Sequence, residues 1–293
     1  MYPAAFEYLA PNGINEAIAL LKQHGDDAKL LAGGQSLVPM MKLRVARPKY
    51  LIDIHRIAEI NYIREDGGDI RCGAMTRHVE IEESPLLREK IVMLSEAASK
   101  IGDTQVRNRG TIGGGLVEAD PAGDYGPIAL ALNAKLKCVG PKGERIIAAE
   151  DFFTFAYTTT LESDEVLTEV IFPLPDRSSA GVYFKLERVA GDFAIASAAV
   201  QLGLDKDGTC NSIGIGVTGA GAVPLKAAAP EILLKGKIIT PELIDEAGRL
   251  VQEGADPIED LRGSASYKKK ALSAILRRAI AESLRRAEAK KSA

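Results

Sequence analysis

Residues 28–40 read AKLLAGGQSLVPM, so a short apolar run leads directly into two adjacent glycines, a glutamine and a serine. A similar loop, TIGGG, stands at residues 111–115. Glycine lacks a Cβ atom and accepts positive φ, so successive backbone N–H groups in such loops can point at one anion. The hydroxyls of Ser36 and Thr111 add a polar group to each loop. Together the two loops predict a ligand with two phosphates.

A strand that runs into two glycines is, taken alone, more often a simple turn. Neither loop contains the lysine of a GxxxxGK[ST] P-loop, and neither matches the GxGxxG fingerprint of dinucleotide-binding βαβ units. The sequence therefore disfavours the usual nucleotide-binding folds. From the glycines alone, a diphosphate site and a pair of turns both remain open interpretations.

The composition is that of an ordinary globular chain. It has 293 residues, 46% of them hydrophobic, and its 37 basic and 40 acidic side chains leave a net charge of −3. This size predicts two or three domains, and the balanced charge offers no broad cationic surface to nucleic acid. The sequence shows no apolar run of about eighteen residues and no N-terminal signal segment. We therefore expect a cytoplasmic location, no integral membrane segment and no nucleic-acid partner.

Metal ligands are sparse and scattered. The cysteines are Cys72, Cys138 and Cys210, and the histidines are His24, His55 and His78. The cysteines form no CxxC pair, no zinc pattern and no iron–sulfur ligation run, and no two histidines have the i, i+4 spacing of one helix face. We therefore expect no metal site on this chain.

Apolar spacing and turn residues predict the elements of the first half. Apolar residues between Ile14 and Leu21 recur at helical spacing and end at Gly25. The other expected elements are strands at 28–31, 50–54 and 69–74, a helix capped by Thr76 and interrupted at Ser84 and Pro85, a longer helix over about 86–101, a helix over 125–134, and a strand pair at 135–140 and 145–152. Residues 102–127 are rich in Gly, Asp and Pro, and we interpret them as an ordered binding loop.

A proline and aspartate cluster at 173–176 marks the expected boundary between two domains. Three strands at 181–188, 195–205 and 212–221 are expected to follow, and then helices over 241–254 and 267–291. Strands followed by helices predict an α+β fold for this part.

Several quoted segments resemble a known family. LAGGQSLVPMMKLRVARP and IGDTQVRNRGTIGGGLVEADPAGD are similar to the two flavin-binding segments of the FAD-containing medium subunit of the molybdenum hydroxylases, the carbon monoxide dehydrogenase and xanthine dehydrogenase family. The resemblance continues through YFKLERVAGDFAIASAAVQL, GAGAVPLKAAAPE and IEDLRGSASYKKKAL, and so covers essentially the whole chain.

The resemblance implies an α+β fold with two domains. Residues 1–175 would form a two-part FAD-binding domain of the vanillyl-alcohol-oxidase (PCMH-like) type, with subdomains at about 1–57 and 58–175. Residues 176–293 would form a smaller C-terminal domain with a three-stranded antiparallel sheet and a helical bundle.

The same resemblance implies which residues bind FAD. The first pyrophosphate loop would comprise Leu31, Ala32, Gly33, Gly34, Gln35 and Ser36, and the second Thr111, Ile112, Gly113, Gly114 and Gly115. Asp124 matches an acidic residue on the ribose or adenine side, Ile101 and Leu167 match apolar contacts, and Lys185 matches a lysine near the isoalloxazine. Family members usually carry asparagine or serine in place of Gly115, and histidine or asparagine in place of Glu118.

Other residues of interest receive simpler interpretations. Phe193 is a candidate to cover one face of the flavin. We interpret His78 as a partly exposed helix residue, and Arg107 and Arg109 as anchors of their loop. No catalytic residue is assigned to this chain, because in a flavoprotein of this kind the cofactor supplies the chemistry.

The resemblance implies an electron-transfer subunit. In the family, a large partner holds a molybdenum pterin, a small partner carries two [2Fe–2S] clusters, and a non-covalent FAD receives electrons and passes them to NAD, a quinone, oxygen or another acceptor. Two such heterotrimers usually associate. Three scattered cysteines agree with this division, because they cannot ligate two clusters. Two alternatives remain, a stand-alone FAD-dependent oxidase or dehydrogenase of the same superfold and a non-catalytic nucleotide-binding module, and the substrate stays open.

Overall fold

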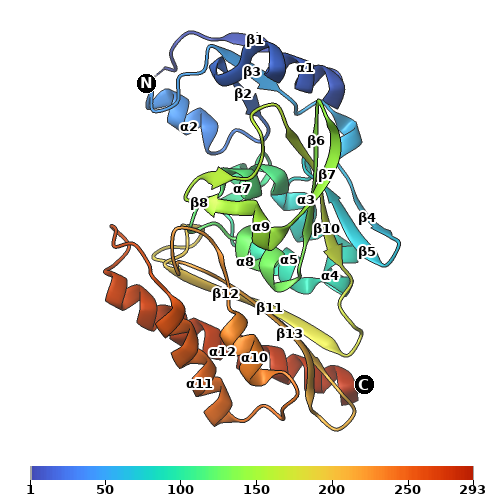
Figure 1. The fold of residues 1–293 in the computed structure, drawn as a ribbon, viewed down its shortest axis with the longest axis vertical. Coiled ribbons are helices and arrows are strands. Elements are labelled where there is room, and N and C mark those ends of the chain that lie inside the picture. The colour runs from blue at the N-terminus through green and yellow to red at the C-terminus, as the bar shows by residue number, and fades with distance from the viewer. Residues whose placement is uncertain (1, 293) are drawn as a thin grey trace.

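The computed structural model describes residues 2–292, which form three main β-sheets that follow one another along the long axis of the molecule (Figure 1). The N-terminal sheet is parallel and has the order β1 (Glu7–Leu9), β3 (Tyr50–Asp53), β2 (Ala28–Leu31). Helix α1 (Ile14–His24) packs its apolar face against this sheet and ends at Gly25, whose φ is 53°. The short helix α2 (Leu37–Lys42) follows the first glycine loop.

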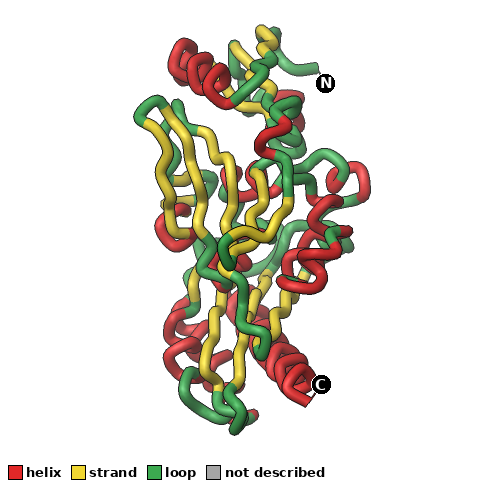
Figure 2. The backbone as a smooth tube through the Cα atoms, turned by 90° about the vertical axis from the view of Figure 1, so that its right-hand side faces the viewer, coloured by secondary structure: helices red, strands yellow, loops and turns green. Residues whose placement is uncertain are grey.

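The middle sheet has five antiparallel strands. Their order is β4 (Ile63–Asp66), β5 (Asp69–Gly73), β10 (Val166–Pro173), β6 (Lys135–Gly140), β7 (Gly143–Ala148). Figure 2 shows these strands running side by side. A separate hairpin joins β8 (Phe153–Phe155) to β9 (Thr158–Thr159).

Seven short helices belong to this middle part. They are α3 (His78–Glu83), α4 (Pro85–Lys90), α5 (Val92–Ala98), α6 (Thr104–Arg107), α7 (Ile112–Glu118), α8 (Tyr125–Ala131) and α9 (Ala149–Phe152). The buried residues of α5, α7 and α8 share one apolar core with the strands of the middle sheet. Burial of this core is the main contribution that holds the second glycine-rich segment, at the start of α7, on a fixed frame.

The C-terminal sheet is antiparallel, with the order β11 (Ser179–Leu186), β12 (Ala196–Leu204), β13 (Cys210–Thr218), β14 (Leu225–Lys226). Helices α10 (Ala228–Leu234), α11 (Pro241–Gly254) and α12 (Ala265–Ser292) share a second core with it. The other face of the sheet lies against α8. Gly214 and Gly216 of β13 leave no room for a side chain, because a Cβ on either would collide with the carbonyl oxygen of Ala131 or Pro127. The sheet is therefore buried between the middle part and the C-terminal helices.

The α+β class is confirmed, as are the helix at 14–24, the strand–glycine-loop unit at 28–36 and the strand pair on either side of residue 142. The second strand of that pair, expected over 145–152, ends at Ala148, and α9 follows it. The C-terminal sheet gains a two-residue fourth strand, β14, beyond the three expected. No helix of the described residues is both long enough and apolar enough to cross a membrane.

Three local predictions were wrong. The helix expected over 86–101 is two helices, α4 and α5, separated at Ile91, which has φ −140° and ψ 65°. Thr76 does not cap α3; its hydroxyl donates to the carbonyl of Tyr62 at 2.9 Å, and Arg77 occupies the N-cap position. The segment 102–127 is not one irregular loop, because it contains α6, α7 and the start of α8.

Candidate functional site

The first glycine loop connects β2 to α2 and presents free backbone donors. The N–H groups of Gly33, Gly34, Gln35 and Ser36 donate to no acceptor within residues 2–292. Gly34 has φ 75°, a value that glycine adopts without strain. Buried or half-buried amides without a partner are costly unless water or a ligand accepts from them. This loop therefore offers four free N–H donors to an anion.

The second loop lies directly beside the first. A Cβ on Gly33 would lie 2.6 Å from the Cα of Gly110 and would also collide with the carbonyl oxygen of Arg109. On the other side, a Cβ on Gly114 would lie 3.9 Å from the Cβ of Ala32. Segments far apart in the sequence thus converge, as the pair of glycine-rich loops predicted.

The second loop does not offer a second set of free amides, however. Ile112 N donates to Thr76 O at 3.0 Å, and Gly113 N donates to Ala74 O at 2.9 Å. Gly114 N donates to the hydroxyl of Thr111 at 3.1 Å, and Gly115 N to the carbonyl of Thr111 at 3.0 Å. Thr111 caps α7 in this way, and its hydroxyl accepts a bond while its own proton stays available. The two loops therefore contribute differently: amides from the first, a hydroxyl from the second.

Two buried aromatic side chains pack against the second loop and the turn before it. His78 and Tyr125 are both buried, and His78 Nδ1 lies 2.9 Å from Tyr125 Oη. A Cβ on Gly110 would lie 2.7 Å from His78 Cδ2, and one on Gly115 would lie 3.2 Å from Tyr125 Cδ2. Burial, with a smaller effect of Arg107, lowers the pKa of His78 to about 4, so the ring is neutral at pH 7. The expectation of a partly exposed His78 was wrong.

Gly115 is one of two positions at which the chain departs from the pattern of the family that its sequence resembles. It is exposed on α7, but a side chain there would press on the ring of Tyr125. At Glu118, the other departure, burial raises the pKa of the carboxyl, and the nearby Asp120 adds to this effect.

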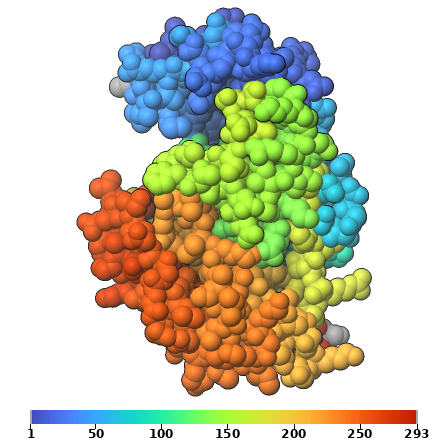
Figure 3. All heavy atoms as spheres, viewed as in Figure 1, coloured from blue at the N-terminus to red at the C-terminus, as the bar shows by residue number. Residues whose placement is uncertain are grey.

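A small pocket opens where the two loops meet the N-terminal part. Its lining residues come from both loops, from the turn before the second loop and from the connections after β3, before β4 and between β5 and α3. They are Ala32, His55, Asn61, Met75, Arg77, Arg109 and Thr111. Figure 3 shows the surface notched on one side between the N-terminal and middle parts. Two arginines, a histidine and a hydroxyl make this a polar, cationic lining. Among these, only Ala32 and Thr111 belong to the site residues expected from the sequence.

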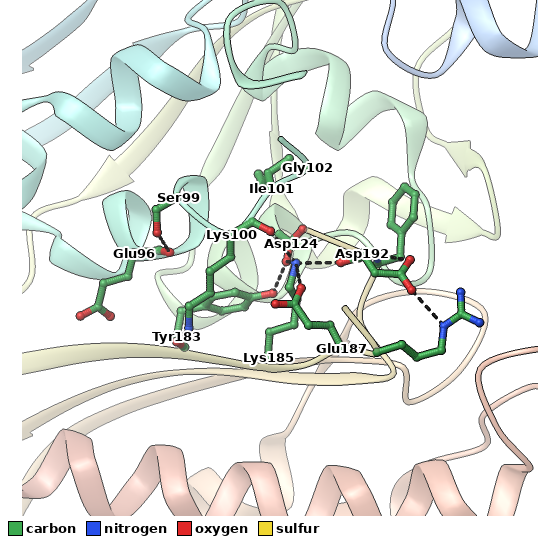
Figure 4. Close-up of polar contacts among 12 residues, drawn as sticks. Glu96, Ser99, Lys100, Ile101, Gly102, Asp124, Tyr183, Lys185, Glu187 and Asp192 are labelled. Atoms are coloured by element: carbon green, nitrogen blue, oxygen red, sulfur yellow. Dashed lines mark hydrogen bonds and ion pairs between the residues drawn. The ribbon is translucent and has the colours of Figure 1, made fainter. Parts of the chain in front are cut away.

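A buried charged cluster lies around Asp124, at the C-terminal end of the segment that contains the second glycine loop (Figure 4). Asp124 Oδ1 accepts from Tyr183 Oη at 2.5 Å and forms an ion pair with Lys185 Nζ at 3.1 Å. Lys185 Nζ also donates to the carbonyls of Lys100 at 2.8 Å and Asp192 at 2.9 Å, and lies 3.1 Å from Glu187 Oε2. Lys185 thus donates two hydrogen bonds to carbonyls and forms ion pairs with two carboxylates. Its charge is balanced by two carboxylates.

The carboxylate of Asp124 is only partly engaged. No hydrogen bond within the described residues involves its Oδ2 atom. Burial raises the pKa of Asp124, while Lys185 and the Tyr183 hydroxyl act in the opposite direction. Burial and the adjacent carboxylate raise the pKa of Tyr183 well above its ordinary value, so this phenol is a proton donor. One carboxylate oxygen therefore remains free to accept from a ligand hydroxyl.

The expected site residues fall into two groups. The loop residues 31–36 and 111–115 form the first, and Ile101, Asp124 and Lys185 form the second, since Lys185 bonds the residue before Ile101. Leu167 lies apart as a buried member of the middle core, on β10 opposite Cys138. Phe193 is 43% exposed and carries the Arg262 guanidinium 5.5 Å from its ring centroid. Arg107 anchors its loop by donating to the carbonyls of Ile101 and Gly102.

Sequence reasoning missed several residues of both groups. Tyr183 and Glu187 follow the period-two alternation of the strand that carries Lys185, which is the signal that could have found them. No comparable signal exists for His55 and Arg77, which reach the pocket only through tertiary contacts. Among the described residues no cluster of three or more His, Cys, Asp or Glu side chains could hold a metal ion.

Comparison with known proteins places this geometry in context. The profile described as "FAD binding domain in molybdopterin dehydrogenase" matches residues 4–175, and that described as "CO dehydrogenase flavoprotein C-terminal domain" matches residues 181–283.

Curated relatives match over nearly their full length. The carbon monoxide dehydrogenase medium chain of Hydrogenophaga pseudoflava is 42% identical over 96% of this chain and 97% of its own length. The medium chain from Afipia carboxidovorans is 38% identical over 98% of this chain and 100% of its own length.

A solved structure of carbon monoxide dehydrogenase from Hydrogenophaga pseudoflava, in a form lacking the molybdenum–pyranopterin moiety, superposes with a TM-score of 0.96 at 43% identity. The alignment covers 98% of this chain and 99% of that one. Both glycine loops lie within the region that matches the FAD-binding profile. The chain therefore belongs to the family of FAD-binding medium subunits of the molybdenum hydroxylases, in which the carbon monoxide dehydrogenase medium chains are found.

Proposed function

We propose that this chain binds one FAD non-covalently and relays electrons from the [2Fe–2S] clusters of a small partner subunit to an external acceptor. The observation that carries the proposal is the row of four unpaired amides at Gly33–Ser36, packed directly against the second glycine loop. A diphosphate is the part of FAD that such donors suit. When bound, FAD supplies reversible redox chemistry, and the protein supplies orientation and electrostatics.

Each group of residues has a distinct role in this proposal. The amides of residues 33–36 and the hydroxyls of Ser36 and Thr111 hold the diphosphate. The free Oδ2 of Asp124 accepts from a cofactor hydroxyl, and Ile101 supplies an apolar contact. Lys185 keeps the Asp124 carboxylate charged and correctly placed, because its ammonium lies 3.1 Å from Oδ1. Leu167, a buried residue of the middle core, supplies a second apolar contact.

The division of the chain at residue 175 and the wider assembly belong to the same proposal. Residues 1–175 form the FAD-binding unit and residues 176–293 the C-terminal unit. A large molybdenum-pterin subunit and a small iron–sulfur subunit are the partners, two heterotrimers associate, and the complex works in the cytoplasm. The relatives named as medium chains of carbon monoxide dehydrogenases support a multi-subunit assembly.

Reconstitution tests the proposal in two steps. The purified chain, freed of flavin and then mixed with FAD, is expected to take up one flavin with a visible absorbance band, and denaturation should release all of it. Co-expressed with its large and small partners, the loaded chain should lose this band when the partners are reduced. Flavin that stays attached after denaturation would favour a stand-alone oxidase, and failure to take up FAD would favour a non-catalytic module.

A further inference from the structure

The pocket beside the glycine loops contains two guanidinium groups that lack any carboxylate partner. Neither Arg77 nor Arg109 forms a side-chain hydrogen bond or ion pair within residues 2–292. By contrast, the neighbouring Arg107 pairs with Glu82 at 2.8 Å. Most arginines of the middle sheet are similarly paired, as Arg71 is with Glu169 at 3.0 Å. Within residues 2–292 other exposed arginines, such as Arg56 and Arg278, are also unpaired, so what distinguishes Arg77 and Arg109 is that they line one pocket together.

An imidazole completes the polar lining. His55 Nδ1 lies 2.8 Å from Oδ2 of Asp53, a buried carboxylate that also accepts from Tyr8 Oη at 2.7 Å and from the backbone N–H of His55 at 3.0 Å. Asp53 therefore fixes the ring at the edge of the pocket. Asp53 is held behind His55, and the lining residues themselves include no acidic side chain.

Two like charges that face one pocket repel each other unless an anion lies between them. A guanidinium matches the oxygens of a phosphate with two parallel N–H donors, and in this respect it differs from a lysine ammonium. The pocket also contains Thr111, whose hydroxyl proton is available, and Ala32, which begins the loop of free amides. Cations, a hydroxyl and amides on one small opening are the donors that a phosphate ester requires.

We propose that Arg77, Arg109 and His55 form a phosphate-binding pocket at the edge of the two glycine loops. The inference rests on the proposed binding of FAD. It adds cationic side chains to a proposed diphosphate site whose other donors, the loop amides and the Thr111 hydroxyl, are neutral. The phosphate has two chemical sources: the diphosphate of the flavin cofactor itself, or a phosphate of a second nucleotide that serves as electron acceptor.

The first test uses inorganic pyrophosphate and the flavin-free chain. Isothermal titration should show binding to the wild-type chain, at least tenfold weaker binding to the double variant Arg77→Gln/Arg109→Gln, and unchanged binding to Arg278→Gln. Arg278 is the matched control, since it is an exposed arginine on α12, far from the loops (Figure 1). Both pocket arginines are exposed, so their replacement should leave the fold intact, and thermal unfolding checks this.

A second titration identifies the source of the phosphate. If the flavin-loaded chain no longer binds pyrophosphate, and the double variant loses affinity for FAD but not for riboflavin, the cofactor's own diphosphate occupies the pocket. If the loaded chain still binds pyrophosphate, the source is a second nucleotide. A wild-type chain that ignores pyrophosphate, or a double variant that binds it within twofold of wild type, overturns the inference. Normal uptake of FAD in that case would leave the proposed function standing.

Discussion

The Cα atom of Gly110 lies 2.6 Å from the point at which a Cβ atom on Gly33 would stand. The two residues belong to different parts of the fold, Gly33 to the loop after β2 and Gly110 to the turn before α7. Only two main chains without side chains between them can approach this closely. This contact fixes the spacing between the free amides of the first loop and the Thr111 hydroxyl of the second.

Replacement of Gly33 by alanine should separate the loops. The added methyl group meets backbone atoms of Arg109 and Gly110, which cannot rotate away, so the main chain must shift. We expect a loss of about 1–3 kcal/mol in the free energy of unfolding and at least a tenfold weaker affinity for FAD. Flavin fluorescence titration and urea unfolding measure the two effects.

Gly254→Ala is the matched control for that variant. Gly254 is exposed at the end of α11, and no atom lies within 4 Å of the Cβ position. This variant should keep its affinity for FAD and its stability within about 0.5 kcal/mol of wild type. Equal FAD affinity in Gly33→Ala and wild type would show that the spacing of the loops does not govern binding.

Local signals in the sequence account for most of the fold. The apolar run before Gly33, the helical spacing ahead of Gly25 and the turn between β6 and β7 each depend on residues close together in the chain, and each was predicted. The break at Ile91 was not predictable in this way, because the apolar pattern continues through it.

The site was predicted in outline and not in its bonding. In the second loop, the N–H groups of Ile112 and Gly113 donate to the carbonyls of Thr76 and Ala74 and are not available to a ligand. No local sequence pattern connects these residues, so this bonding could not be predicted. The burial of His78 did have a signal, since it lies three residues before the buried Ile81 and so on the same helix face. Lys185 was found by resemblance, but the two carbonyls and two carboxylates that it contacts come from separate segments.

Removal of the Lys185 ammonium should be strongly destabilising. In Lys185→Met, the carboxylates of Asp124 and Glu187 lose their shared cation at a position where the lysine side chain is fully buried. Breaking a buried ion pair costs roughly 3–5 kcal/mol, because an uncompensated charge remains. Urea unfolding at pH 7 should show a loss of this order.

Two further variants test the cause of that loss. Lys49→Met removes an ion pair with Asp27 in which both side chains are at least half exposed, and it should cost less than about 1 kcal/mol. Asp124→Asn combined with Lys185→Met should be less destabilising than the sum of the single changes, because it removes one of the stranded charges. Strict additivity would mean that Asp124 and Lys185 do not interact.

The buried His78 should make stability depend on pH in a defined window. Burial lowers its pKa to about 4 in the folded chain, against an ordinary value of 6.5. As the pH falls through this range, the unfolded chain binds a proton that the folded chain excludes, so the free energy of unfolding decreases, and the effect levels off below about pH 4. The stability of wild type relative to His78→Gln should therefore fall by about 2 kcal/mol between pH 7 and pH 4.5. Urea unfolding at both pH values gives this difference, in which the carboxylates common to both chains cancel.

Tyr125→Phe, which removes the hydrogen bond at 2.9 Å but keeps the imidazole, should lower stability at both pH values and retain the pH dependence of wild type. Parallel pH curves for wild type and His78→Gln would instead place the titration elsewhere in the molecule.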